Sequence, residues 1–356
     1  MKVCILGDGL VSLSLANILI NNNIFVDIFT YQKIKKQNKN RTIGISKSNI
    51  EYFNKNIVNI EKFLWNINKI EIYSENLKKE KILDFENDKT RLFSIIKNSD
   101  LNNCLLSKLK KSKLIKFKKK IENFETIKKK YQLIIDCDLN NKITKKIFYK
   151  KFEKKYFSYA HATIIQHKEI INNTAIQIFT KKGPIAFLPI SKKNTSIVYS
   201  AKGDRNIRLL DMINKYNLKY KIVKMNKPDC FELKSMGMRS YYHKNILAFG
   251  DLLHKLHPLA GQGFNMSIRD INELSKIIKK KISLGLDLDS SIFHEFEKKT
   301  KHKNYLFSNG IDLIYEFFNF ENKINSQVIS KSIKFLNNNK LINKFIIKSA
   351  DEGIII

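Results

Sequence analysis

Two segments near opposite ends of the chain combine glycines with polar residues at spacings that suit ligand binding. The first reads Gly7-Asp8-Gly9-Leu10 and lies between an apolar run and a helical pattern. One glycine permits a tight turn, and the next lets backbone amides at a helix N-terminus approach a phosphate. The segment matches the first two glycines of G-x-G-x-x-G but carries Ser12 at the third. A dinucleotide-binding turn and a purely structural turn are therefore both open.

The second segment covers residues 250–270 and reads GDLLHKLHPLAGQGFNMSIRD. Its Asp251 follows a strand-like run, where a carboxylate can accept hydrogen bonds from a chain of hydroxyls. Its Gly261-Gln262-Gly263 exposes backbone amides at the start of a helical pattern, where they could hold an electron-rich ring. An ordinary capped loop would not require His257-Pro258 before these glycines or Asn265 after them. The pattern therefore favours a binding site.

The elements that must position the first segment are short and continuous. An apolar run at Lys2–Leu6 predicts a buried strand, Leu10–Asn21 has helical spacing, and Phe25–Phe29 predicts a second strand. A strand, a glycine turn, a helix and a strand within about thirty residues form a βαβ unit with parallel strands. The N-terminal region is therefore predicted to be a parallel sheet covered by helices.

Later elements follow a different order. The middle of the chain predicts strands without long helices between them, which is typical of an antiparallel sheet, at Lys69–Tyr73, Thr163–Gln166, Ala175–Phe179, Ile185–Pro189 and Ser196–Ser200. A further strand is predicted at Asn245–Phe249. Helices are then predicted at Asn265–Leu284 and Ser291–Phe307, with two further amphipathic stretches toward the end of the chain.

Residues 250–270 resemble the second FAD signature of the class A flavin monooxygenases, and within them the ubiquinone-biosynthesis hydroxylases. That family's segment reads G-D-A-A-H-x-x-H-P-x-A-G-Q-G-x-N-x-G-x-x-D, from which only Leu252, Leu253 and Ser267 depart. Shorter resemblances occur at Arg41-Thr42, at residues 97–106 and at residues 183–189, so the likeness is nearly full length. It implies the para-hydroxybenzoate hydroxylase fold: an α/β, Rossmann-like FAD-binding domain with an inserted antiparallel substrate domain and C-terminal helices.

The resemblance also implies roles for individual residues and a division into domains. The FAD-binding positions would be Gly7, Gly9, Leu10, Arg41, Asn98, Asp138, Gly250, Asp251, Gly261, Gln262, Gly263, Phe264 and Asn265. The catalytic position would be Pro258, through its backbone, at the flavin edge where O2 reacts. The FAD-binding domain would comprise residues 1–65, 92–150 and 235–290. The substrate domain would comprise 66–91 and 151–234, and a helical region 291–356.

The implied activity is an FAD-dependent monooxygenase that hydroxylates a polyprenylated phenol in ubiquinone biosynthesis, with NAD(P)H as the expected electron donor. Two alternatives stay open: a class A enzyme acting on another aromatic compound, and a catalytically silent FAD-fold subunit of a biosynthetic complex. Departures from the family pattern bear on this choice. The family's Asp-Gly motif is replaced by Asp138-Leu139, and Thr30 stands where an acidic residue usually binds a ribose. Reduction by a nicotinamide nucleotide is therefore the least supported part of the hypothesis.

The composition narrows the expected partners and cofactors. With 66 Lys+Arg against 33 Asp+Glu the formal net charge is +33, which suits nucleic acid or an anionic membrane. The lysines are spread along the chain without a nucleic-acid motif, so no specific nucleic acid is expected. The four cysteines form no Cys-x-x-Cys pair, and His254 and His257 lack a third ligand nearby, so no metal site is expected. Local hydrogen bonding is the preferred interpretation of both histidines.

The expected location is cytoplasmic, with peripheral contact at the inner face of the membrane. The apolar stretch from Val3 to Ile20 is interrupted by Asp8, and no run is long enough to span a bilayer. A prenylated phenol is nearly insoluble, so the substrate must be met at a bilayer or received from a partner. Lysine-rich amphipathic stretches at 276–281, 298–303 and 331–348 make the C-terminal third the expected membrane-facing region. Packing of these helices on the flavin domain is an equal alternative.

Overall fold

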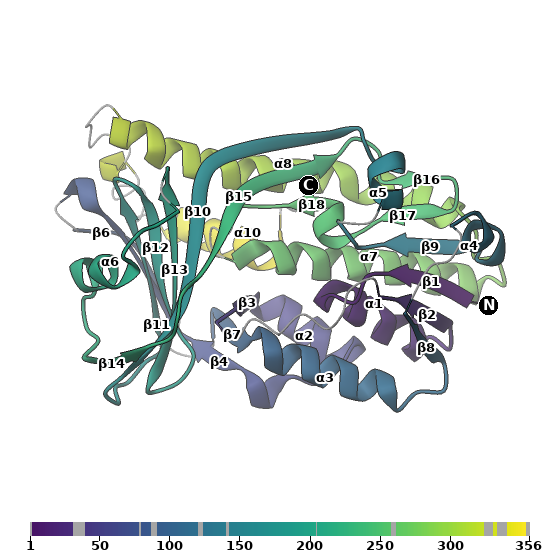
Figure 1. Cartoon of the computed structure of the whole chain (residues 1–356), viewed down its shortest axis with the longest axis horizontal. Coiled ribbons are helices and arrows are strands. Elements are labelled where there is room, and N and C mark those ends of the chain that lie inside the picture. Colours follow the sequence, from purple (N-terminus) through teal and green to yellow (C-terminus); the bar gives the residue numbers. More distant parts are fainter. Residues whose placement is uncertain are drawn as a thin grey trace.

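The computed structural model describes residues 2–30, 40–77, 80–86, 91–119, 124–139, 142–203, 205–257, 261–323, 330–332 and 340–353. Within them the chain forms a mixed α/β fold in which a largely parallel sheet and a larger, mostly antiparallel sheet stand side by side (Figure 1). Pro258, the predicted flavin-edge residue, lies outside the described residues.

The first sheet has six strands in the order β16-β17-β9-β1-β2-β8. They are β1 (Lys2–Leu6), β2 (Phe25–Phe29), β8 (Ile115–Lys118), β9 (Leu133–Asp136), β16 (Tyr242–His243) and β17 (Ile246–Ala248). All neighbours pair in parallel except β16 and β17. The predicted βαβ unit is confirmed residue for residue, because β1 and β2 flank α1 (Leu10–Asn21). Continuous apolar runs suit these strands because helices cover the sheet.

The helices around this sheet supply the main core. They are α2 (Lys47–Asn56), α3 (Asn98–Lys110), α4 (Phe124–Lys130), α5 (Lys142–Ile147) and α7 (Gln262–Ser283), with short 3-10 turns at η1 (Glu61–Phe63), η2 (Glu75–Leu77) and η3 (Gly250–Leu252). Helix α1 packs against both α3 and α7. Because nine of the twelve residues of α1 are buried, this helix lies at the centre of the domain.

The second sheet has nine strands, ordered β18-β15-β10-β13-β12-β11-β5-β6, with β14 paired to β10. They are β5 (Lys69–Ser74), β6 (Glu80–Glu86), β10 (Lys151–His167), β11 (Thr174–Thr180), β12 (Gly183–Pro189), β13 (Asn194–Lys202), β14 (Ile222–Met225), β15 (Asp229–Met238) and β18 (His254–Lys255); α6 (Leu209–Tyr216) packs on it. The predicted antiparallel sheet is confirmed with one exception. Strands β5 and β11 pair in parallel, which no local pattern indicates because they are distant in sequence.

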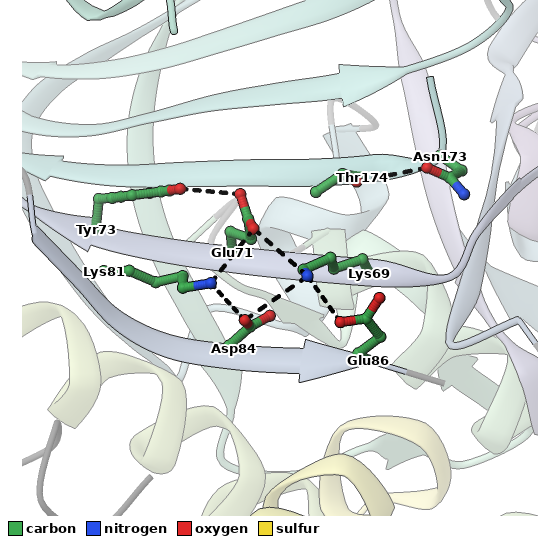
Figure 2. A network of polar contacts seen from close by, with 8 residues as sticks. All are labelled: Lys69, Glu71, Tyr73, Lys81, Asp84, Glu86, Asn173 and Thr174. Atoms are coloured by element: carbon green, nitrogen blue, oxygen red, sulfur yellow. Dashed lines mark hydrogen bonds and ion pairs between the residues drawn. The ribbon is translucent and has the colours of Figure 1, made fainter. Parts of the chain in front are cut away.

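Charged side chains cover the β5–β6 end of this sheet (Figure 2). Lys69 on β5 reaches Glu86 on β6 at 2.7 Å, and Lys81 reaches Asp84 at 2.5 Å. Glu71 lies within 3.8 Å of both lysines and accepts a hydrogen bond from the Tyr73 hydroxyl. Strand β6 is an edge strand of the sheet, and charged side chains on an edge strand discourage it from pairing with a strand of another chain. We therefore assign this network a structural role.

A third, three-stranded sheet connects the two larger ones to the C-terminal helices. Its strands are β3 (Thr42–Ser46), β7 (Phe93–Lys97) and β4 (Trp65–Ile67), all antiparallel. Strand β3 contacts α7 and α10 (Lys340–Glu352). Helix α8 runs from Ser291 to Lys323, beyond the predicted end at Phe307, since no proline interrupts the helical pattern there. The domain boundaries given above stay a proposal.

An ion cluster is buried where β1, β2 and β8 meet. The Asp27 carboxylate on β2 is fully buried, and it accepts a hydrogen bond from the Tyr131 hydroxyl at 2.5 Å. The Lys118 and Lys2 ammonium groups lie 2.7 and 3.1 Å from the same oxygen. Burial raises the pKa of Asp27, but hydrogen bonds from Lys118, Tyr131 and Lys2 outweigh burial and lower it overall. The ionised form of Asp27 therefore stabilises the folded state.

We expect Asp27→Asn to reduce the free energy of unfolding by roughly 1–3 kcal/mol at pH 7, because three donors lose a charged acceptor. The folded pKa of Asp27 is depressed, so its contribution is complete above the unfolded pKa of 3.8 and is lost as the pH falls through the folded pKa. Urea unfolding of the unmodified protein and of Asp27→Asn, measured between pH 7 and pH 3, should therefore show a difference in the free energy of unfolding that becomes smaller only below about pH 4.

The matched control is Glu86→Gln, which weakens an exposed ion pair and should cost less than about 1 kcal/mol at any pH. A difference between Asp27→Asn and the unmodified protein that stays constant down to pH 3 would contradict the assignment of a lowered pKa to Asp27.

Candidate functional site

Three chain segments end together at the carboxyl edge of the parallel sheet. The Gly7 amide, after β1, donates to the Phe29 carbonyl at 2.9 Å, and the Cys137 amide, after β9, donates to the Leu6 carbonyl at 2.9 Å. The Phe249 amide, after β17, donates to the Asp136 carbonyl at 2.8 Å. This edge is where open α/β sheets bind ligands. The structure therefore brings Gly7, Asp138 and Gly250, which are far apart in sequence, to one edge.

The first glycine segment leaves the start of α1 open. Gly7 has φ +100°, and a side chain there would lie 3.5 Å from Asp138. Gly9 is the N-cap of α1 and makes no side-chain capping bond, so Leu10 begins the helix with its amide end uncovered. A Cβ added at Gly9 would meet nothing within 4 Å. The N-terminus of a buried helix thus faces open space, which suits an anionic group.

The second glycine segment lies directly against that helix. Gly250 has φ +63°, and a Cβ there would come within 3.0 Å of the Val11 side chain. The next residue, Asp251, is exposed. Burial, partly offset by the Ser12 hydroxyl and reinforced by the nearby carboxylates of Asp136, Asp251 and Asp138, raises the pKa of the Cys137 thiol to about 12. Carboxylates from two of the segments therefore converge beside the start of α1.

The start of α7 provides a second helix N-terminus with a glycine cap. Its N-cap, Gly261, is left-handed at φ +64° and lies close to β3, with an added Cβ 3.6 Å from the Gly44 amide nitrogen. An added Cβ at Gly263 would again meet nothing within 4 Å. The Gln262 Oε1 atom is buried and has no hydrogen-bond partner among the described residues. This end of α7 therefore offers unmatched polar groups to a ligand.

Two of the predicted ligand residues have structural side chains. Asn265 is buried; its amide donates to the Gly44 carbonyl at 2.9 Å, and its carbonyl accepts from the Ser46 amide at 3.0 Å. The Phe264 ring packs at 6.4 Å from the Phe53 ring. Contact with a ligand at these positions would thus come from the backbone, as the resemblance implies.

Arg41 and Asn98 lie at the other side of this region. The Asn98 amide, which begins α3, donates to the Arg41 carbonyl at 2.9 Å. The Arg41 side chain is exposed and makes no ion pair within the described part of the chain. Arg41 therefore provides a positive charge directly before β3, the strand that contacts α7.

The two histidines of the second segment differ. His254 makes the predicted local hydrogen bond, with Nε2 2.5 Å from the Asp270 carboxylate. For His257 it stays a prediction, because its ring nitrogens have no partner among the described residues and the adjoining residues 258–260 lie outside them. The His257 ring instead packs 4.8 Å from Tyr156 and 4.2 Å from Tyr315. Burial, with a smaller effect from Lys154, lowers its pKa to about 4, so His257 is neutral at physiological pH.

Sequence reasoning missed the residues that join β3, α2 and α10. The Asn49 side-chain amide donates to the side-chain carbonyl oxygen of Asn265 at 3.1 Å. The Ser48 backbone amide donates to the Asp351 carboxylate at 2.8 Å. Gly44 lies against Gly261. A glycine inside a strand-like run often marks a close approach of another backbone, so Gly44 itself was the signal in the sequence. The other contacts join residues that are more than 200 positions apart, so no local pattern reports them.

The departures from the family pattern are accommodated without breaking the fold. Ser12 is fully buried in the first turn of α1, and its hydroxyl has no partner among the described residues. Leu139 packs against the main core at its edge. These substitutions therefore change packing beside the glycine turn and leave the start of α1 open.

The residues present fit an adenine dinucleotide. Two helix N-termini, of α1 and α7, carry glycine caps without side-chain bonds, and the added Cβ atoms at Gly9 and Gly263 would enter open space. Amides suit the phosphates, whereas the Asp138 and Asp251 carboxylates would repel phosphates and accept hydrogen bonds from hydroxyls. A cleft of about 1130 Å³ lies elsewhere, between β15, β18 and α8, and none of the predicted site residues lines it.

No protein-family model matches the sequence. Sequence relatives include an uncharacterised protein, slr1300, of Synechocystis, 28% identical over 46% of this chain and 42% of its own length. The 3-demethoxyubiquinol 3-hydroxylase of Escherichia coli is 30% identical over 40% of this chain and 39% of its own. The ubiquinone biosynthesis monooxygenase COQ6 of Schizosaccharomyces pombe is 21% identical over 51% and 48%. In each match this chain spans less than half of the relative.

Solved structures match over nearly the whole chain. The p-nitrophenol 4-monooxygenase PnpA of Pseudomonas putida has a TM-score of 0.78 at 11% identity, covering 99% of this chain and 98% of its own. HpxO of Klebsiella pneumoniae, solved with FAD and uric acid, has a TM-score of 0.76 at 11% identity, covering 98% and 96%. The chain therefore has the fold of the FAD-dependent aromatic hydroxylases, and over about half of its length it is homologous to hydroxylases of ubiquinone biosynthesis.

Proposed function

We propose that this chain is an FAD-dependent monooxygenase that hydroxylates the aromatic ring of a polyprenylated phenol in ubiquinone biosynthesis. The observation that carries the proposal is the meeting of the start of the second glycine segment with the first turn of α1, where Gly250 lies against Val11. These are the two segments that a dinucleotide spanning both ends of the chain would need. Bound FAD would supply the activation of O2, and NAD(P)H is the proposed reductant.

Each site residue is assigned a role that its position supports. The amides after Gly7 and Gly9, with Leu10, Asn98 and the Arg41 charge, bind the adenosine diphosphate half. The carboxylates of Asp138 and Asp251 accept hydrogen bonds from hydroxyls of the cofactor. The backbone from Gly261 to Asn265 binds the flavin ring. The role of Pro258 at its reactive edge rests on the resemblance alone, because Pro258 lies outside the described residues. Gln262 contributes its side-chain carbonyl oxygen, which has no partner among the described residues.

The chain's other contribution is to keep the reacting ring away from water. Helix α7 and strand β3 are held together by Asn265, and α10 is tied to the same strand through Ser46, whose hydroxyl donates to the Asp351 carbonyl at 2.9 Å. These contacts make a rigid wall at the start of α7. A closed wall would exclude water from the reacting ring and hold the substrate in register.

We further propose a lipophilic phenolic substrate, met at a membrane surface or delivered by a biosynthetic complex. Among the described residues, no helix is long and apolar enough to cross a membrane. The phenol is proposed from the names of the sequence relatives, E. coli 3-demethoxyubiquinol 3-hydroxylase and S. pombe COQ6.

Purified protein is expected to be yellow with non-covalent FAD, and to consume O2 when given NAD(P)H and a prenylated phenol. Absorbance near the flavin band, flavin release on denaturation and an oxygen electrode measure these properties. Protein that is colourless and fails to bind added FAD would refute the proposal. Bound FAD without O2 uptake would instead favour the silent subunit, and uptake only with other phenols would favour a different aromatic substrate.

We expect Asp251→Ala to weaken FAD binding by roughly 1–3 kcal/mol, because a hydroxyl of the cofactor loses its charged acceptor. By the relation between free energy and affinity this is a rise of about 5- to 150-fold in Kd. Asp287→Ala removes the same charge from an exposed position after α7 and should leave Kd unchanged. Equal Kd values for the two variants would show that the contact is misplaced.

We expect Gly9→Ala to weaken FAD binding by on the order of tenfold or more, because the added methyl group occupies the space in front of the α1 amides. Gly9 has φ −72°, so alanine adds no backbone strain there. Gly237→Ala on β15 is the matched control, since an added Cβ also meets nothing within 4 Å. Titration with FAD should separate the two variants while thermal unfolding of the flavin-free proteins does not.

A further inference from the structure

The outer face of α8 changes character along the helix. In its first half the exposed residues are polar and mostly basic, including Lys298, Lys299 and Lys303. From Tyr305 onward most of them are apolar, with exposed fractions of 46–60%: Tyr305, Leu313, Ile314, Phe317 and Phe320. The spacing from 313 to 317 to 320 places three of them on one side of the helix. Figure 1 shows α8 running along an outer edge of the molecule, from the parallel sheet to the antiparallel sheet.

The fold does not need these outer side chains for its core. The opposite face of α8 already packs inward through Phe307, Ile311 and Phe318, beside Met266 of α7. The Phe318 ring stacks on the Phe179 ring of β11 at 3.6 Å. Because α8 is anchored by that face, the outer apolar stripe is an uncovered surface within the described structure. Exposed apolar clusters of this kind mark interaction sites.

Positive charge flanks the stripe at both ends. Lys299 is paired with Glu273 and Glu295, but no ion pair within the described residues involves Lys298 or Lys303. At the other end Lys331 is exposed, and its neighbour Ser330 donates its hydroxyl to Glu321 at 2.5 Å. Glu316, the acidic residue inside the stripe, is neutralised by Lys154 at 3.0 Å. An apolar stripe between basic ends complements an anionic bilayer surface.

We propose that this face of α8 lies on an anionic membrane leaflet, with Phe317 and Phe320 among the acyl chains and Lys298, Lys303 and Lys331 at the phosphates. The inference deepens the proposed function, on which it rests, because a polyprenylated phenol resides in the bilayer. A second copy of this chain fits the face less well. In a two-fold dimer the stripe of one copy would lie on the stripe of the other. The basic ends would then meet either the other copy's basic ends or its apolar residues, and neither offers an acidic partner.

The inference moves the contact away from the lysine-rich stretch expected from the sequence. Most of 331–348 lies outside the described residues or in α10, which contacts α2 and β3. Removing α10 would break the bonds from Ser46 and Ser48 to Asp351 and disturb the flavin site. Point variants on α8 are therefore the appropriate test.

The test compares full-length Phe317→Ser/Phe320→Ser with Ile171→Ser/Val223→Ser, which removes two exposed apolar side chains from the antiparallel sheet region. Co-sedimentation uses phosphatidylcholine vesicles containing about one third phosphatidylglycerol, at low salt. We expect the α8 variant to bind on the order of tenfold more weakly and the control to bind like the unmodified protein. Lys298→Gln/Lys303→Gln should weaken binding and reduce its dependence on salt.

A second measurement reports insertion directly. Phe317→Trp should show fluorescence quenching by brominated phospholipids, above the background of Trp65, whose indole donates to the Asn172 carbonyl. Absence of quenching, or equal vesicle binding by both serine variants, overturns the proposal. The proposal is also overturned if the α8 serine variant has a lower solution mass than the unmodified protein but binds vesicles equally well. That result would make this face of α8 a contact between copies of the chain.

The outcome is separable from that of the proposed function. Turnover of a short, water-soluble phenol and the FAD content do not require a membrane, so the α8 serine variant should retain both. Protein that binds FAD and hydroxylates this phenol without binding vesicles overturns only the membrane surface. Protein that binds vesicles through α8 but holds no FAD supports the surface and refutes the hydroxylase.

Discussion

The approach of Gly250 to the first turn of α1 is the constraint on which the site depends. Any side chain at Gly250 would meet Val11 within 3.0 Å, and the left-handed backbone there disfavours other residues. This contact lets the segment after β17 reach the helix that follows β1. The start of α7 is then fixed by Gly261 against Gly44 and by the Asn265 bonds to β3. Two helix N-termini with glycine caps, those of α1 and α7, result.

Charge is arranged differently in two parts of the parallel sheet. In the middle of β2, Asp27 is buried and neutralised by Lys2 and Lys118. At the carboxyl end of the sheet, Asp138 and Asp251 lie beside the glycine turn. The first cluster stabilises the fold, because its carboxylate is paired within the chain. The second lies where the proposed FAD would offer its hydroxyls to carboxylates and its phosphates to helix amides.

Helix α8 connects the site to the molecular surface. Its inner face packs on α7 and on the antiparallel sheet, and its Tyr315 encloses His257. His257 is consequently held neutral between two aromatic rings, whereas His254, only three residues earlier, is bonded to Asp270. The two histidines therefore have different environments. His254 faces Asp270 of α7, whereas His257 lies between Tyr156 of β10 and Tyr315 of α8.

Much of the framework followed from local sequence. Strands Lys2–Leu6 and Phe25–Phe29 and the helix between them were predictable because each is a continuous run whose periodicity and bounding glycines act within a few residues. Residues 250–265 could be predicted to be a cofactor segment because glycines at special backbone positions leave a recognisable spacing. Such signals are local, so they survive in a single sequence.

Tertiary structure decided what local patterns cannot encode. Asn49, Gly44 and Asp351 complete the wall of the site through contacts with residues more than 200 positions away, or in different helices. The parallel pairing of β5 with β11 depends on the assembled sheet. Helical spacing showed that the C-terminal region is amphipathic, but not that Phe318 is buried while Phe317 and Phe320 are exposed. Periodicity gives the relative orientation of side chains, and only packing against other elements determines which face is covered.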